Sequence, residues 1–511
     1  MKRACGGRSS GTAAVDSPTR ISVPLILLTD VAQTLQAHSI LLTGGNGFLG
    51  KVVLAYLLDR LPGVNHVYLL IRPKWDLPAE DRFYDETLAS PVLAAIAGKR
   101  GRAWLRERVT VLAGDVGAPN CGLSDEEVDR LRGRVGAVLN GAGLVEFFPP
   151  VDESFRSNVE GVRHLVAMTK RLGARLAHVS TCFVCGQGDG LVEETEPILG
   201  FYPRRKGPED TSFRHAEEIA YCQERIAHID RASKDASKRL TELGRQRAEH
   251  WGWTNTYTYA KSLGEQIIAA EPDLPWTILR PAIIEAALRF PFPGWVEGGR
   301  TAAPLVLMAR GGMRDWPVRR DAPLDVVPVD LVAAALLVAT ALLLAGKQEP
   351  VYQLGTADVN PVYLEPLVEL LSGEARFVTP EEAKARRARL QRRIERAQSA
   401  LGGLQRAIQA AGLPGRQRLA GWSLALRTRS LQAALREQTL DQYLPFIHHN
   451  RYIFETANIR SAYAQITERD RALLPWDPEG IDWREYWVHN EVEGIQRWVQ
   501  PEAVKQWAFQ I

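Results

Sequence analysis

The stretch NTYTYAKSLGE, residues 255–265, contains two tyrosines and one lysine at spacings that suit proton transfer. On a helix, side chains four residues apart share a face, whereas side chains two residues apart point in nearly opposite directions. Tyr257 lies four residues before Lys261, and Tyr259 lies two before it. A nearby ammonium stabilises a phenolate and lowers its pKa from about 10. The spacing therefore predicts that Tyr257 is the proton donor and that Tyr259 is a packing residue.

A third polar group is expected where the run RLAHVST, residues 175–181, ends. The Thr181 hydroxyl can hydrogen-bond a substrate oxygen at this position, and Ser180 is the second candidate. Asn158 has two interpretations: it orients Lys261 through a water molecule, or it makes a polar contact within its own helix.

Two cysteines follow directly, Cys182 and Cys185, with two residues between them. No second Cys or Cys/His pair follows at zinc-finger spacing, so we expect no metal. Small apolar side chains at the end of a strand are the simpler interpretation.

The stretch ILLTGGNGFLGKVVLAYLL, residues 40–58, has the pattern of a strand, a glycine turn and a helix. Its glycines fit both G-x-G-x-x-G and G-x-x-G-x-x-G, which predicts close approach to a pyrophosphate and a helix N-terminus that faces it. We expect the dinucleotide to contact Thr43, Gly44, Gly47, Phe48, Leu49 and Gly50.

The second run, HVYLLIRPKW, ends in Arg72 and not in the acidic residue that holds an NAD ribose. An arginine there can pair with a 2′-phosphate, so the sequence favours NADPH. Further cofactor contacts are predicted at the ends of the third and fourth runs, where a carboxylate and small residues occur. These are Asp115, Val116, Asn140 and Ala142, and Tyr257 and Lys261 complete the set.

These residues follow short apolar runs that alternate with longer helical stretches between about residues 39 and 290, with one further run at 351–355. Runs without period-two alternation are typical of strands buried on both faces, so we predict an α/β fold: a Rossmann-type, doubly wound parallel sheet. We expect a disordered or weakly ordered segment at 1–35, a reductase domain at 36–360 with a helical insertion at 201–254, and a mainly helical domain at 361–511.

The composition excludes several other classes of protein. A net charge of +3 on 511 residues does not favour nucleic-acid binding, and five scattered cysteines do not form a disulfide framework. The apolar run at 331–346 is shorter than the roughly 20 residues of a membrane span, and we expect a buried helix there. No secretory signal is evident, so a cytoplasmic protein is expected.

Residues 381–440 are expected to be helical, with an apolar stripe that includes Leu390, Ile394 and Leu401. Seven Lys or Arg and three Glu lie between residues 381 and 396. This basic face is either simply solvated or a surface for acidic ligands or lipid headgroups, so peripheral membrane contact near 384–396 is one interpretation.

Several stretches resemble the fatty acyl-CoA reductases of the bacterial alcohol-forming kind, within the extended short-chain dehydrogenase/reductases. They are TGGNGFLG, VYLLIRP, HVSTCFVCG, TYTYAKSLGEQ, FPGWVEGG, DVVPVDLVAAA and IDWREYWVHNEVEGIQRW. The resemblance covers roughly residues 39–500, including a C-terminal "sterile"-type domain. It implies that NADPH reduces a long-chain acyl-CoA to an aldehyde and then to a primary alcohol. Thr181, Tyr257 and Lys261 would be the catalytic residues.

Two departures from the family pattern concern the nicotinamide side of the site. The fourth run ends Asn140-Gly-Ala-Gly-Leu144, and Phe183-Val-Cys185-Gly follows Thr181. Three alternatives stay open at this point: a reductase that stops at aldehyde, a sugar-nucleotide epimerase or dehydratase, and a non-catalytic NADPH sensor. The sequence does not indicate the oligomeric state or the preferred chain length.

Overall fold

The computed structural model describes residues 28–501, except 75, 196, 208, 300 and 412–415. Its centre is a seven-stranded parallel sheet with the strand order β11-β7-β5-β4-β1-β2-β3. The strands are β1 (Ser39–Thr43), β2 (Val67–Ile71), β3 (Val109–Ala113), β4 (Val135–Asn140), β5 (Arg175–Val179), β7 (Trp276–Pro281) and β11 (Val351–Leu354). Each of the seven apolar runs forms one strand, so the predicted doubly wound Rossmann-type sheet is confirmed.

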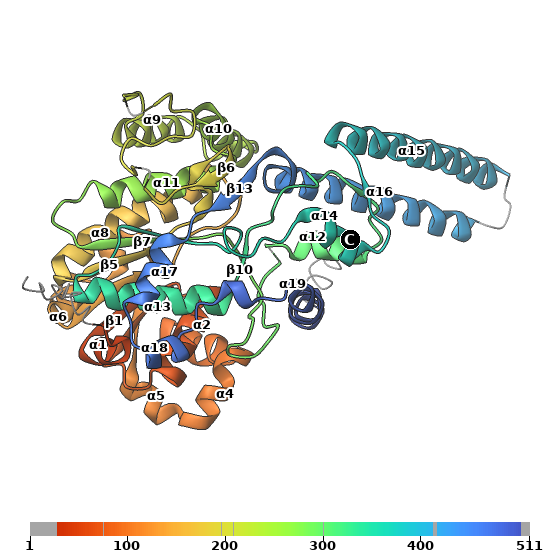
Figure 1. Cartoon of the computed structure of the whole chain (residues 1–511). Coiled ribbons are helices and arrows are strands. Elements are labelled where there is room, and N and C mark those ends of the chain that lie inside the picture. The colour runs from red at the N-terminus through yellow and green to blue at the C-terminus, as the bar shows by residue number, and fades with distance from the viewer. Residues whose placement is uncertain are drawn as a thin grey trace, which may run out of the picture.

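Helices cover both faces of this sheet (Figure 1). On one face α1 (Val31–Ala37), α2 (Phe48–Ala55) and α13 (Val329–Ala345) contribute to one hydrophobic core. On the other face α6 (Asp125–Leu131), α8 (Gly161–Leu172) and α11 (Thr256–Ala269) contribute to a second. The β1 strand is buried along its whole length because side chains on both of its faces enter a core.

The apolar run at 331–346 lies within α13, in which every residue from Val329 to Leu344 is buried. The expected buried helix is therefore confirmed. Near its start, the Asp330 carboxylate accepts the backbone N–H groups of Leu288 and Arg289 at 2.8 and 2.9 Å, which ties the helix to the segment after β8 (Ile283–Glu285). In the part of the chain that the structure describes, no helix is long and apolar enough to cross a membrane.

The insertion at 201–254 contains two helices, α9 (His215–Ala227) and α10 (Ala236–Trp251), which pack against α11. At the other end of the chain, residues 1–27 of the segment expected to be disordered lie outside the described residues. Residues 31–35 of that segment are part of the α1 helix. Val31 and Leu35 are buried, and the Val31 N–H donates to Asp470 at 2.8 Å.

The region after β11 is mainly helical. It contains α14 (Leu364–Ser372), α15 (Pro380–Ala410), α16 (Arg416–Leu444), α17 (Ala457–Ala464) and α18 (Glu468–Leu473). The α15 and α16 helices lie side by side and extend away from the sheet (Figure 1). The chain then returns to the region of the parallel sheet, where β13 (Arg451–Phe454) pairs in parallel with β6 (Asp189–Val192).

Candidate active site

The glycine turn between β1 and α2 is shaped by close backbone contacts. Gly44 has a φ of +71°, and a Cβ there would lie 2.6 Å from the backbone of Gly141. A Cβ on Gly50 would lie 2.1 Å from the Gly44 carbonyl oxygen. Gly47 precedes α2, so the unpaired N–H groups of that helix start face the turn. This cradle fits the pyrophosphate of a dinucleotide, because only a side-chain-free backbone leaves it room.

A cleft of about 290 Å³ opens beside the turn. It brings together seven of the predicted cofactor residues: Thr43, Gly44, Gly47, Arg72, Asp115, Val116 and Ala142. Four other predicted residues lie outside the lining of the cleft. Phe48 packs on Trp295 with 5.0 Å between ring centroids, Leu49 is partly buried in the core, Gly50 presses on Gly44, and Asn140 is buried.

Two arginines line the end of the cleft at β2. Arg72 is exposed, with its guanidinium 3.9 Å from the Asp115 carboxylate. Arg82 was not predicted from the sequence. It lies ten residues further on and reaches back to donate to the Arg72 carbonyl at 2.6 Å. The sequence held one signal that could have indicated Arg82: a basic residue in the first helical turn after the second strand. The cleft therefore has two guanidinium groups at its end beside β2.

Tyr257 is in the first turn of α11, which Asn255 caps by accepting the Thr258 N–H at 2.9 Å. Burial raises the pKa of Tyr257, and a hydrogen bond with the Thr181 side chain opposes that effect. The expected lowering of this pKa by Lys261 is not seen in this structure, in which burial is the largest effect. The Lys261 Nζ lies 2.6 Å from the Val179 carbonyl oxygen and 3.2 Å from His178 Nε2.

Lys261 itself is only 4% exposed. Burial lowers its pKa to about 8, and the negative charge of Glu265 opposes this change. Glu265 is held by a buried ion pair with Arg280, at 2.5 and 3.0 Å. Because a low dielectric disfavours an isolated ammonium, the pKa of Lys261 lies in the range where enzymes exchange protons.

Tyr259 points to the opposite side of α11 and is fully buried. Its hydroxyl donates to Glu218 at 2.5 Å and lies 3.2 Å from the Cys222 sulfur. Arg247 completes this cluster with an ion pair to Glu218 at 2.6 Å. Tyr259 therefore joins α11 to the inserted helices α9 and α10.

Thr181, at the end of β5, is 5% exposed, accepts the Phe183 N–H at 3.3 Å and bonds with Tyr257. The neighbouring Ser180 hydroxyl is buried and has no hydrogen-bond partner within the described residues. Asn158 pairs with both backbone groups of Leu144, at 2.9 and 3.0 Å. It therefore fixes the loop after β4.

Aromatic side chains from distant segments lie beside the catalytic residues. The backbone carbonyl oxygen of Phe147 accepts the Tyr257 backbone N–H at 3.3 Å, and Phe183 is two residues from Thr181. Phe446, from the C-terminal region, lies 5.1 Å from the Phe147 ring and 5.0 Å from the Phe183 ring. This apolar side of the site has no local signal in the sequence, because Phe446 is about 190 residues from Tyr257.

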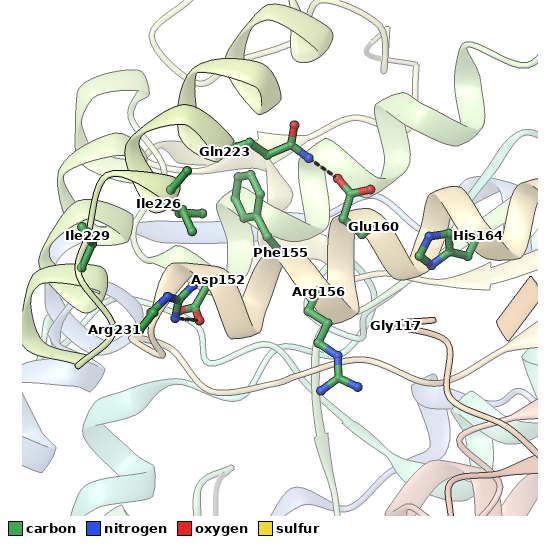
Figure 2. A pocket seen from close by; sticks show the side chains of 11 residues that line it. Gly117, Asp152, Phe155, Arg156, Glu160, His164, Gln223, Ile226, Ile229 and Arg231 are labelled. Atoms are coloured by element: carbon green, nitrogen blue, oxygen red, sulfur yellow. Dashed lines mark hydrogen bonds and ion pairs between the residues drawn. The ribbon is translucent and has the colours of Figure 1, made fainter. Parts of the chain in front are cut away.

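A second, larger groove of about 510 Å³ lies on the outer side of α7 (Val151–Phe155) and α8, below α9. Figure 2 shows that several of its polar side chains already bind one another. Arg231 pairs with Asp152, and Gln223 donates to Glu160 at 2.7 Å. The groove contains no residue of the glycine turn and none of Thr181, Tyr257 or Lys261. The cleft contains the turn, and a Cβ added to Gly143 in its lining would lie 4.0 Å from Lys261 Nζ, so the cleft is the candidate active site.

The sequence model of the male sterility protein, an NAD-binding family, matches residues 42–336, which include the glycine turn, Thr181, Tyr257 and Lys261. The chain belongs to the male sterility protein family. This family member is 26% identical over 498 residues to "Probable fatty acyl-CoA reductase 5" of Arabidopsis thaliana, covering 91% of this chain and 97% of that protein. It is 29% identical over 350 residues to "Alcohol-forming fatty acyl-CoA reductase" of Simmondsia chinensis, covering 66% and 71%.

Among solved structures, this male sterility family member is similar to the terminal R domain from the myxalamid PKS-NRPS biosynthetic pathway. The TM-score is 0.51 at 20% identity, and the match covers 84% of this chain and 85% of that one. The likeness supports the Rossmann-type fold. Both sequence relatives are plant proteins, although the motifs resembled the bacterial kind of reductase.

Proposed function

We propose that this protein is an NADPH-dependent reductase that converts long-chain fatty acyl-CoA to a primary alcohol through a fatty aldehyde. The observation that carries the proposal is the interaction of the Thr181 and Tyr257 side chains near a cleft lined by the glycine turn, in a chain whose relatives are named fatty acyl-CoA reductases. Bound NADPH would supply a hydride. The residues that would hold it are those of the glycine turn, Arg72, Arg82 and Asp115.

The roles of the protein side chains follow from their positions. Thr181 donates a hydrogen bond to the carbonyl oxygen of the thioester, where negative charge develops. Tyr257 gives that oxygen its proton, and Lys261 contacts the nicotinamide ribose. Loss of the CoA thiol then leaves the aldehyde. A second reduction of the aldehyde at the same site, again with Tyr257 as the acid, yields the alcohol.

The experiment that tests the reaction is a combined product and cofactor analysis of the purified protein with NADPH and palmitoyl-CoA. Two NADPH consumed per fatty alcohol, with little free aldehyde, is the expected result. One NADPH per accumulated aldehyde would mean that the reaction stops at the first step. If no thioester of any chain length causes NADPH oxidation, the reductase proposal is wrong, and an epimerase or a sensor takes its place.

We also propose that residues 361–511 form a C-terminal domain whose α15 and α16 helices touch a membrane surface. Both helices extend from the body and expose large apolar side chains: Leu390, Leu404, Trp422, Leu424, Leu431 and Leu435. The sequence from 380 to 444 has 13 Lys or Arg and 5 Asp or Glu, whereas the whole chain has a net charge of only +3. Exposed apolar groups among cations suit an anionic lipid surface, which is also where a fatty alcohol would partition.

Sedimentation with phosphatidylserine-containing vesicles tests this contact. Leu424→Ser should weaken binding, whereas Leu191→Ser, which changes a similarly exposed leucine on β6, should not. Added salt should weaken binding as well, because the cations act through a screened attraction. Equal binding by the two variants, or binding to neutral vesicles only, would contradict the proposed surface.

A further inference from the structure

Three aromatic rings meet beside the proposed catalytic residues, and each comes from a different part of the chain. Phe183 follows Thr181 closely, and its backbone N–H donates to the Thr181 hydroxyl at 3.3 Å. Phe147, in the loop after β4, is bonded through its backbone carbonyl oxygen to the Tyr257 N–H. Phe446, which follows α16, lies 5.1 Å from the Phe147 ring and 5.0 Å from the Phe183 ring. Its ring therefore touches both loops that carry or bind the catalytic residues.

The last turn of α16 adds a fourth ring. Tyr443 lies 5.7 Å from the Phe147 ring, and its hydroxyl donates to the Thr301 carbonyl oxygen at 2.7 Å. Phe446 is 7% exposed, Tyr443 and Phe183 are each 8% exposed, and Phe147 is only partly buried. We call these four residues, Phe147, Phe183, Tyr443 and Phe446, the aromatic wall. The C-terminal region supplies half of it.

The aromatic wall and the cofactor cleft are separate surroundings of the catalytic residues. The cleft approaches Lys261 at Gly143, whereas the four rings, all among the described residues, lie outside its lining. A long-chain thioester carries hydrocarbon directly beside its carbonyl carbon, and hydrocarbon leaves water favourably only for an apolar surface. Aromatic side chains offer a large apolar area with few rotamers. The wall therefore has the chemistry that the acyl part of the substrate needs.

We propose that the aromatic wall is the acyl-chain subsite and that Phe446 determines specificity for long chains. The inference rests on the proposed function, because it takes a fatty acyl thioester as the substrate. With the carbonyl oxygen of the thioester at Thr181 and Tyr257, the first methylenes of the chain lie against the rings of Phe147, Phe183 and Phe446.

A small apolar cavity adjoins the wall and gives the chain room beyond the rings. Its volume is about 30 Å³, it is lined largely by α12 (Ala303–Arg310) and α14, and every side chain in its lining is hydrophobic. Ile447 and Ala302 both belong to the lining. Ile447 adjoins the wall in sequence, and Ala302 follows Thr301, to which the wall is bonded. An apolar cavity of this kind offers water no partner but accepts hydrocarbon.

The test is calorimetric titration of the full chain with S-hexadecyl-CoA, a thioether that cannot be reduced, and with CoA alone. The ratio of the two affinities measures what the hydrocarbon contributes. In the native protein the thioether should bind more tightly by about tenfold or more. Phe446→Ala should remove most of this ratio and leave the affinity for NADPH unchanged.

Phe454→Ala is the matched control, because its ring packs on Phe183 at 5.3 Å but lies outside the wall. A folded Phe446→Ala protein that keeps the native ratio would overturn the proposal, and so would an equal loss in Phe454→Ala. If the native protein binds S-hexadecyl-CoA no more tightly than CoA, the proposed function itself fails and the subsite falls with it.

A second measurement uses the native chain and does not depend on the folding of a variant. A CoA thioether that carries a diazirine near its sulfur is bound and illuminated, and the labelled peptides are identified by mass spectrometry. Label should appear in the peptides that contain Phe147, Phe183 or Phe446, and excess S-hexadecyl-CoA should prevent it. Competed label elsewhere, for example on α7 and α8 along the outer groove, would overturn the subsite while acyl-CoA binding stands.

Discussion

Tyr257 and Tyr259 show how two identical side chains in one helical turn acquire different chemistry. Tyr257 interacts with the Thr181 side chain, whereas the Tyr259 hydroxyl contacts Glu218 and Cys222. Two positions correspond to about 200° of rotation on an α-helix, so one phenol faces the site and the other faces the inserted helices.

We predict that Tyr257→Phe lowers kcat by about a hundredfold or more, because a general acid contributes roughly that much. NADPH binding, measured by fluorescence titration, should persist. Tyr259→Phe is the matched control and should keep most activity while lowering the melting temperature, because the buried Glu218 loses the Tyr259 hydroxyl and keeps only its other donors, such as Arg247. If Tyr259→Phe is the inactive variant, the assignment of the two tyrosines is reversed.

Arg72 is predicted to decide between the two nicotinamide cofactors. Arg72→Ala should raise the KM for NADPH by about tenfold or more, since a charge-assisted phosphate contact is lost, and should change the KM for NADH little. Steady-state kinetics with both cofactors provide the measurement. Arg82→Ala should act in the same direction, because Arg82 lines the same end of the cleft. Equal effects on the two cofactors would refute the 2′-phosphate assignment.

The turn between β1 and α2 depends on backbone shape more than on any side chain. Gly44 and Gly133 both have a φ of +71°, but only Gly44 has backbone atoms within contact distance of an added Cβ. Substitutions at Gly44 and Gly133 can therefore be compared. Both place a side chain on a left-handed backbone, but only the one at Gly44 also places it against neighbouring backbone atoms.

Gly44→Ala should abolish dinucleotide binding, because its Cβ would lie 2.6 Å from Gly141. Gly133→Ala should cost about 1–2 kcal/mol of stability for the left-handed backbone and leave binding unchanged. Isothermal titration with NADPH and denaturant unfolding measure the two effects. If both variants lose NADPH binding, the close approach of Gly44 to Gly141 does not explain the loss.

Across the whole molecule, buried acidic residues join the end of the chain to the reductase region. Glu285, on β8 (Ile283–Glu285), accepts the Ala302 N–H at 2.7 Å. Glu491, about 200 residues later, accepts the Ala286 N–H at 2.9 Å. Burial raises the pKa of both carboxyl groups, and the charge of Glu491 raises that of Glu285 further. The pair therefore retains a proton that the unfolded chain would release.

This retained proton predicts that stability falls as pH rises. Above the ordinary carboxyl pKa the unfolded state loses its protons first, so folding becomes less favourable until the native groups ionise as well. Glu491→Gln supplies a permanent N–H donor toward Glu285 and should make the melting temperature less dependent on pH between 5 and 8. Glu493→Gln, an exposed neighbour, is the control. Parallel melting curves for Glu491→Gln and the native protein would contradict the shared proton.

The sequence by itself determined the seven strands, the glycine turn and the face shared by Tyr257 and Lys261. These features depend on local periodicity and on backbone space, which neighbouring residues specify. It also indicated Arg72, because that residue follows its strand directly. Arg82 was missed because its return to the cleft depends on the path of the connecting segment.

Only the tertiary structure decided the surroundings of Lys261 and the apolar side of the site. His178 and Asn140 are 38 residues apart and meet because β4 and β5 are neighbours in register. Phe446 reaches Phe147 because the C-terminal region folds back onto the sheet. Contacts of this kind depend on strand order and on the path of the chain, which no local pattern in the sequence encodes.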